Sequence, residues 1–206
     1  MTAPILLTGF QPIGEGTVDP TALLMERLAG EPGVVTAILT PVYDRCGDEF
    51  AELLDRHAPM AALGFALAEA TDYIRVERIA WNCDESPRPD EAGTIREQQA
   101  IAPDGPTAYG STLPIPRVMR ELAMAGLPVT FGDFSGGFLG NHLFYRARHA
   151  IETAGLDVPM GFFHMPPLPE RVAEVRGRAG LPLERQELAA RVLLDMLWRA
   201  LGGPHK

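Results

Sequence analysis

The sequence predicts the α/β fold class, as a single-domain α/β/α sandwich with a mixed, mostly parallel, twisted sheet and helices on both faces. The first observation is that short apolar runs of strand length alternate along the chain with amphipathic stretches of helical spacing. The second is size, because a chain of 206 residues that is 46% hydrophobic can bury one substantial core. No internal repeat divides the chain, so we assign residues 1–206 to one domain.

The first half of the chain supplies strands and helices in alternation. The expected strands are the apolar runs Pro4–Thr8, Val34–Leu39 and Met60–Phe65. Asp19 is expected to cap a helix that starts at Pro20, because proline is favoured at the first helical position, and Gly30 ends it. A second helix is predicted from apolar residues at helical spacing, namely Phe50, Leu53 and Leu54.

The second half continues the alternation after a strand that contains Glu77. A proline-rich loop over residues 86–110 follows, and a loop of this length in a compact domain is usually functional or mobile. The helices are marked by apolar residues at helical spacing: Val118, Leu122 and Ala125; Leu143, Ala147, Ile151 and Ala154; and the long run Leu183–Leu201, which Gly202 ends. The remaining strands are Pro128–Phe131 and Pro159–Met165. Ligands of such sheets bind at the carboxyl ends of the strands, so we expect the loops after Gly9, Thr40, Gly64, Phe131 and His164 to build the site.

Composition excludes several classes of function. A net charge of −9, spread without long acidic runs, argues against nucleic-acid binding, and no apolar run is long enough to span a membrane. The N-terminal run lacks a basic leader, so we expect no signal peptide. Cys46 and Cys83 are too few for a disulfide framework and read as reduced thiols of a cytoplasmic protein. Neither has a cysteine or histidine nearby at ligand spacing, so we expect no metal and no cofactor.

The stretch from Asp133 to Arg148 joins a strand to a helix through a glycine-rich turn. The start of such a helix has free backbone N–H groups that stabilise negative charge. An enzyme can place an anionic nucleophile or an oxyanion there. A tight strand–helix connection without chemistry is the alternative interpretation.

Within this stretch, GFLGNHLFY resembles the nucleophile segment of pyroglutamyl peptidase I, a cysteine peptidase that removes N-terminal pyroglutamate. The matching residues are Gly136, Phe138, Asn141, His142, Leu143, Phe144 and Tyr145. The position of the nucleophilic cysteine in the family pattern is occupied here by Gly140. The resemblance therefore implies that this chain keeps the segment that holds the nucleophile but lacks the cysteine sulfur that attacks the substrate.

Three further segments resemble the same family: TGFQPIG near the N-terminus, VERIAWN in the middle and GFFHMPPLPE near the end. The resemblance implies that Glu77 is the catalytic acidic residue and His164 the catalytic histidine. It also implies a set of substrate-binding residues, namely Phe10, Ile13, Phe65, Phe138, Leu139 and Asn141. Ile13 replaces a family phenylalanine that stacks on the lactam ring, and Phe65 replaces a glutamine associated with lactam recognition. Both departures alter the expected pyroglutamate pocket.

Two hypotheses about function follow from the missing nucleophile. In the first, the protein is a divergent enzyme that uses Glu77 and His164 as an acid/base pair on a small lactam, imide or related cyclic ligand. In the second, it is an inactive family member that binds a ligand or has a regulatory role. Ser135, Cys46 and Cys83 are the candidate replacement nucleophiles, and we favour natural divergence over an engineered Gly140.

The expected partners also follow from the resemblance. They are a small molecule or the N-terminus of a peptide, with no nucleic acid and no membrane. A homo-oligomer, a dimer or a tetramer, is expected because bacterial members of the family commonly form such assemblies.

Overall fold

The computed structural model describes residues 3–14 and 17–203. The two ends of the expected 1–206 domain, and Glu15 and Gly16 in the first glycine-containing loop, lie outside the described residues. Within the described part of the chain, no helix combines the length and the hydropathy needed to cross a bilayer.

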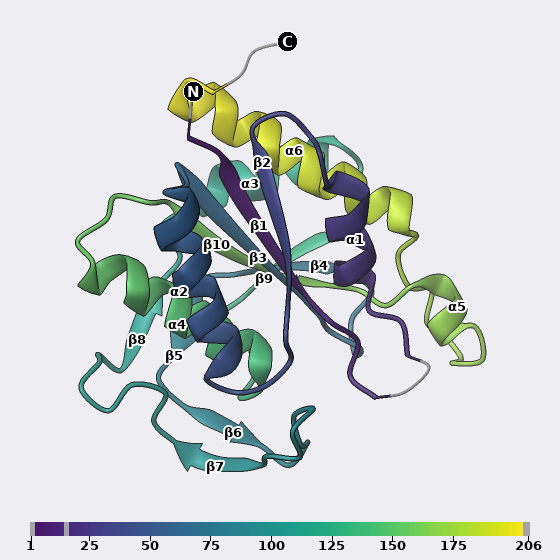
Figure 1. Ribbon diagram of the computed structural model, residues 1–206. Coiled ribbons are helices and arrows are strands. Elements are labelled where there is room, and N and C mark those ends of the chain that lie inside the picture. Colours follow the sequence, from purple (N-terminus) through teal and green to yellow (C-terminus); the bar gives the residue numbers. More distant parts are fainter. Residues whose placement is uncertain (1–2, 15–16, 204–206) are drawn as a thin grey trace.

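A twisted six-stranded sheet forms the centre of the molecule (Figure 1). Its strands, in spatial order, are β2 (Val34–Leu39), β1 (Ile5–Phe10), β3 (Ala61–Leu67), β10 (Met160–Met165), β4 (Ile74–Glu77) and β9 (Val129–Gly132). The first four run parallel to one another, whereas β4 is antiparallel to β10 and β9 is parallel to β4. The predicted mixed, mostly parallel sheet is confirmed.

Helices cover both faces of this sheet, so the predicted α/β/α arrangement is also confirmed (Figure 1). One face packs against α1 (Pro20–Leu28), α3 (Ile115–Met124) and α6 (Leu183–Leu201). The other face packs against α2 (Arg45–His57) and α4 (Leu139–Thr153). A short helix, α5 (Pro169–Val172), was not expected from the periodicity because it makes little more than one turn.

Local signals place the start of α1 and the end of α6 where the sequence predicts them, whereas α1 ends at Leu28, two residues before the expected Gly30. Asp19 caps α1 by accepting a hydrogen bond from the backbone N–H of Thr21 at 2.7 Å, and Pro20 follows at the first helical position. At the other end of the chain, α6 stops at Gly202, whose φ of 74° lies in the left-handed region that favours glycine.

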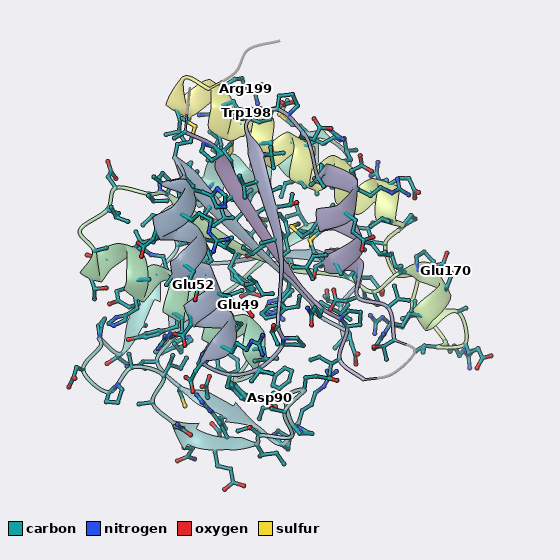
Figure 2. All side chains as sticks on the ribbon, in the orientation of Figure 1. Glu49, Glu52, Asp90, Glu170, Trp198 and Arg199 are labelled. Carbon is teal, nitrogen blue, oxygen red and sulfur yellow. The ribbon has the colours of Figure 1, made fainter. Side chains whose placement is uncertain are left out.

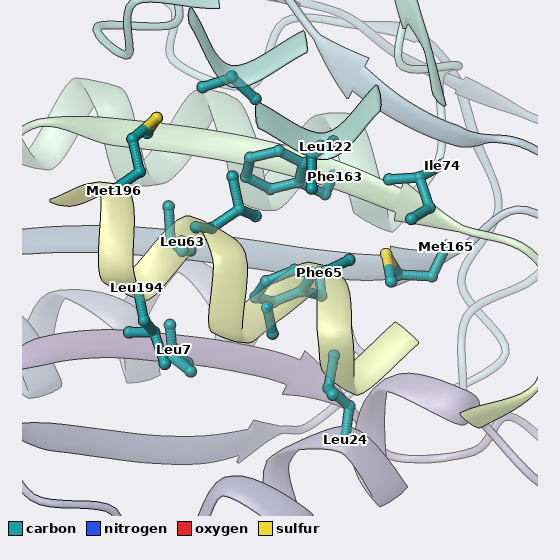
Figure 3. Packing of buried hydrophobic residues seen from close by; sticks show 14 of the residues in the cluster. Leu7, Leu24, Leu63, Phe65, Ile74, Leu122, Phe163, Met165, Leu194 and Met196 are labelled. Atoms are coloured by element: carbon teal, nitrogen blue, oxygen red, sulfur yellow. The ribbon is translucent and has the colours of Figure 1, made fainter. Parts of the chain in front are cut away.

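The core between the sheet and α6 is centred on two stacked aromatic rings (Figure 3). Phe65 on β3 and Phe163 on β10 are fully buried, and their ring centroids are 5.5 Å apart. The two residues lie opposite each other on neighbouring strands, so their rings stack across the strand pair.

Truncating Phe163 to alanine is expected to lower the free energy of unfolding by about 3–5 kcal/mol, because the lost ring leaves a cavity that its close-packed neighbours fill only in part. Urea denaturation followed by circular dichroism measures this change. Phe134→Ala is the control. Phe134 is 62% exposed, so this variant loses an identical ring from the surface and leaves no buried cavity. Equal losses for both variants would contradict the assigned core.

The region expected to be a loop over residues 86–110 contains short strands. β6 (Asp84–Ser86) pairs with β7 (Arg96–Gln99), and β5 (Ile79–Trp81) pairs with β8 (Ala108–Gly110). These strands were missed because each is only three or four residues long and β7 is entirely polar or charged. The Asp90 carboxylate accepts the backbone N–H groups of Tyr43, Ala92 and Thr94, and so fastens this region to the segment before α2 (Figure 2).

The direction of β9 corrects one expectation about the site. Because β4 and β9 run against the other strands, β9 ends at Gly132, level with Glu77 and with Phe162 in the middle of β10. The loop after Phe131 therefore does not start at the carboxyl edge shared by β1, β3 and β10. Residues 133–138 instead carry the chain back toward that edge and into α4.

Candidate active site

His164 and Glu77 form a buried, hydrogen-bonded pair on the sheet face that α4 covers. The imidazole Nδ1 lies 2.7 Å from Glu77 Oε1, and the two side chains are 9% and 0% exposed. A carboxylate oxygen only accepts hydrogen bonds, so Nδ1–H donates, and in the neutral imidazole the lone pair is then on Nε2. The structure thus brings together the two residues to which the family resemblance assigns acid/base chemistry.

Arg75 adds a positive charge to this pair. One guanidinium nitrogen lies 2.8 Å from the same Glu77 Oε1, and the guanidinium also donates to the Phe134 carbonyl at 2.8 Å. Arg75 therefore compensates a buried carboxylate and holds the turn that leads to α4. Glu77 Oε2 has no hydrogen-bond partner among the described residues. A Cβ at Gly132 would lie 2.5 Å from this oxygen, so a side chain at position 132 would clash with the Glu77 carboxylate.

Gly140 lies directly against the imidazole. A Cβ built on Gly140 would be 2.6 Å from His164 Nε2, closer than real Cβ contacts permit. The ring of His164 thus occupies space that a side chain at position 140 would need. Nε2 of this ring faces the start of α4.

The start of α4 offers hydrogen-bond donors at this place. Phe138 is the N-cap residue and makes no side-chain capping bond. The first intrahelical hydrogen bond of α4 is donated by the backbone N–H of His142 to the carbonyl of the N-cap residue, Phe138. Helix geometry leaves the N–H groups of Leu139, Gly140 and Asn141 without an intrahelical acceptor, and the helix dipole favours negative charge beside them.

A cavity of about 250 Å³ opens over the imidazole and the helix start. Its apolar lining includes Phe10, Ile13, Phe138 and Leu139, four residues that the sequence assigns to ligand binding. Its polar and charged lining comprises Thr17, Asp19, Glu69, Ser86, Arg88, Ser135, His164 and Arg171. This volume suits a small ring rather than an extended peptide.

Two of the expected ligand-binding residues lie outside this cavity. Phe65 packs into the core on the opposite face of the sheet, because strand residues alternate between faces and the register sets Ala66, not Phe65, beside His164. The Asn141 side chain accepts from the backbone N–H of Trp81 and donates to the carbonyls of Trp81 and Cys83. Asn141 therefore fastens α4 to the segment after β5 and contributes only its backbone to the site.

The candidate replacement nucleophiles are differently placed. Cys46, the second residue of α2, is fully buried, and burial raises the pKa of its thiol. Burial likewise raises the pKa of Cys83, and neither thiol lines the cavity. Ser135 does line it, but its hydroxyl donates to the Ile79 carbonyl at 3.2 Å and no base is bonded to it among the described residues.

Arg75 and Arg88 are site residues that the sequence analysis missed. Arg75 lies two residues before Glu77 in the same strand, so strand alternation puts both side chains on one face and would have indicated it. Arg88 lies in the proline-rich region, where no periodicity exists to place it. Its guanidinium carbon lies 5.4 Å from the centroid of the Phe138 ring at the cavity.

Comparison with known proteins gives consistent results over nearly the whole chain. The family described as pyroglutamyl peptidase matches residues 3–197. A pyrrolidone-carboxylate peptidase of Cupriavidus pinatubonensis is 36% identical, with 97% of each chain covered. A pyrrolidone-carboxylate peptidase of Pyrococcus furiosus is 31% identical over 94% of this chain and 99% of its own length.

Solved structures agree with these sequence matches. The pyroglutamyl peptidase I of Bacillus amyloliquefaciens superposes with a TM-score of 0.87 at 30% identity, covering 93% of this chain and 94% of the other. The Pyrococcus furiosus pyrrolidone carboxyl peptidase gives a TM-score of 0.89 at 30% identity, covering 96% and 99%.

Proposed function

The chain belongs to the pyroglutamyl peptidase family, and on that premise we propose that it hydrolyses small cyclic amides, such as lactams or imides, with water as the nucleophile. His164 acts as the general base, Glu77 orients it, and the start of α4 stabilises the oxyanion. This proposal differs from covalent peptidase chemistry because Gly140 provides no attacking atom.

The observation that carries the proposal is the position of His164 Nε2. This nitrogen lies 2.6 Å from where a Gly140 Cβ would be, and so beside the free N–H groups at the start of α4. Glu77 holds the opposite nitrogen at 2.7 Å, which supports the tautomer that a general base requires. A base and an oxyanion site thus share one wall of the cavity.

The steps of the proposed reaction use only these groups and water. Nε2 takes a proton from a water molecule as the water oxygen attacks the ring carbonyl carbon. The oxyanion that forms faces the N–H groups of Leu139 and Gly140. Its collapse breaks the ring C–N bond, and the imidazolium returns the proton to the leaving nitrogen. A lactam yields an amino acid in this way, and an imide yields a half-amide.

The absence of a covalent nucleophile narrows the substrate class. General-base catalysis contributes typically about 10²–10⁴-fold, which is little for an unstrained amide. An imide has a better leaving nitrogen than an ordinary amide, and a small ring fits the cavity of about 250 Å³. We therefore infer five-membered imides as the preferred class and lactams as the second.

The test is incubation of the purified protein with succinimide and with pyroglutamyl amide, followed by mass spectrometry of the ring-opened products. We expect turnover of the imide, and a loss of roughly 10²–10⁴-fold in His164→Asn. His57→Asn is the matched control, because His57 ends α2 outside the cavity. Binding of these rings without turnover would contradict the proposal and support a ligand-binding family member instead.

A further inference from the structure

We propose that His164 also acts as a nucleophile, so that the protein takes acyl groups from activated esters and thioesters onto Nε2 and hydrolyses the resulting acyl-imidazole. This activity goes beyond the proposed ring opening because it passes through a covalent bond to the protein. It assigns to the site a second substrate class, acyl donors with a good leaving group.

The geometry of Gly140 is the first observation behind this inference. A Cβ built on Gly140 would lie 2.6 Å from His164 Nε2. The ring nitrogen is therefore close to the position that a side chain at residue 140 of α4 would occupy. Nε2 therefore faces the backbone N–H groups at the start of α4 from the direction in which a side chain at position 140 would face them. An acyl carbonyl bound over these N–H groups therefore presents its carbon to Nε2.

The second observation is how the ring is held. Its side chain is 9% exposed, Nδ1–H donates to Glu77 Oε1 at 2.7 Å, and no described residue is hydrogen-bonded to Nε2. The ring of Phe162 packs edge-on against it, with centroids 5.5 Å apart. The imidazole is thus fixed in direction, and in its neutral form the Nε2 lone pair points toward the cavity. The Glu77 carboxylate stabilises the positive charge that develops on the ring when Nε2 forms a bond.

The third observation is the nature of the cavity wall. Phe10, Ile13 and Phe138 present apolar surface beside the imidazole, which suits a short acyl chain or an aryl leaving group. The charged groups that line the same cavity, among residues 3–14 and 17–203, are Asp19, Glu69, Arg88 and Arg171. Among the described residues, none of these is hydrogen-bonded to His164. Within the part of the chain that the structure describes, no acid is positioned against Nε2, so the proposed reaction needs a leaving group that departs as a stable anion.

The reaction balances without a further reagent. The Nε2 lone pair forms a bond to the acyl carbon, and the C–O or C–S bond breaks as the phenolate or thiolate leaves with its electron pair. The acyl-imidazolium releases its Nδ1 proton toward Glu77 and solvent. Water then attacks the acyl carbon, the C–N bond breaks with its electron pair on the ring, and one water proton restores the protonated nitrogen of the imidazole as the carboxylic acid leaves. The sum is hydrolysis of one ester or thioester by one water molecule.

The experiment mixes the protein with p-nitrophenyl acetate in a stopped-flow instrument and quenches parallel samples for intact mass and peptide mapping. We expect a burst of one nitrophenolate per chain and one acetyl group on the peptide that contains His164. His164→Asn should abolish the burst. Glu77→Gln should slow it by at least about a hundredfold, because a carboxylate that orients a reacting imidazole is worth that much or more.

Gly140→Ala and His57→Asn separate this proposal from ordinary esterolysis by a surface histidine. The methyl group of Gly140→Ala would meet Nε2 at 2.6 Å and displace the ring, so we expect a burst at least tenfold slower while the circular dichroism spectrum is retained. His57→Asn should retain the full burst. Acetylation spread over several histidines, or a burst unchanged in Gly140→Ala, would overturn the inference. If the protein opened succinimide but showed no burst with p-nitrophenyl acetate, the proposed ring-opening function would stand and only the acyl-imidazole inference would be refuted.

Discussion

Replacing Glu77 with glutamine is expected to lower turnover of a cyclic imide by roughly 10²–10⁴-fold. The carboxylate accepts from His164 Nδ1 at 2.7 Å and so holds Nε2 toward the cavity. When Nε2 takes up a proton, the negative charge of the carboxylate also stabilises the imidazolium. Glutamine keeps the shape of the side chain but offers no charge, and its amide can turn a donor toward the ring. Initial rates measured under saturating imide test the expectation.

Asp133→Asn is the matched control for this experiment. The Asp133 carboxylate is also paired with an arginine, Arg78, but it lies on the surface near the turn before α4. Exposed ion pairs of this kind contribute about 0–1 kcal/mol, so the rate of Asp133→Asn should stay close to that of the unchanged protein. Similar losses in the two variants would show that Glu77 acts through general stability rather than through His164.

Replacing Gly140 with cysteine is expected to create a thiol that alkylates roughly a hundredfold faster at pH 6 than either native cysteine, because a helix start and a neighbouring imidazole both stabilise a thiolate. The new Cβ would stand 2.6 Å from His164 Nε2, so the imidazole must move aside. It then remains next to the sulfur as a partner for the thiolate. Burial raises the pKa of both Cys46 and Cys83, which keeps them slow.

Iodoacetamide labelling followed by peptide mapping gives the rates. Ser135→Cys is the matched control, because Ser135 lines the same cavity but precedes the helix. A thiol introduced there lacks the N–H groups at the start of α4 and should alkylate at an ordinary rate. Equal rates for the two introduced thiols would mean that the start of α4 does not stabilise an anion. Such a result would also weaken the oxyanion role assigned to it above.

Much of the fold was predictable from local pattern. Val34–Leu39 and Leu183–Leu201 were predicted with the bounds that the structure shows, because a continuous apolar strand and a long amphipathic helix carry strong periodic signals. Asp19 followed by Pro20 predicted the start of α1 for a chemical reason, namely the capping of free N–H groups. The short strands β5 to β8 have no comparable signal, since each is only three or four residues long and β7 contains no apolar residue.

The candidate site was predictable in part. The resemblance pointed to Glu77, His164 and Gly140, and the structure brings these three together. It also pointed to Phe65 as a ligand-binding residue, although Phe65 lies across the sheet in the core. Sequence order alone does not say which face a strand residue occupies until the register with its neighbours is known.

The sequence by itself determined the layered α/β architecture, the ends of its main helices and the absence of a nucleophilic side chain at Gly140. These features depend on residue type and on spacing within one segment. Only the tertiary structure decided that Arg75 shares the Glu77 carboxylate with His164, and that the imidazole stands where a side chain of α4 would otherwise be. The physical reason is that β4, β10 and α4 meet through strand register and helix packing, so the distances between their side chains depend on contacts among residues far apart in the chain.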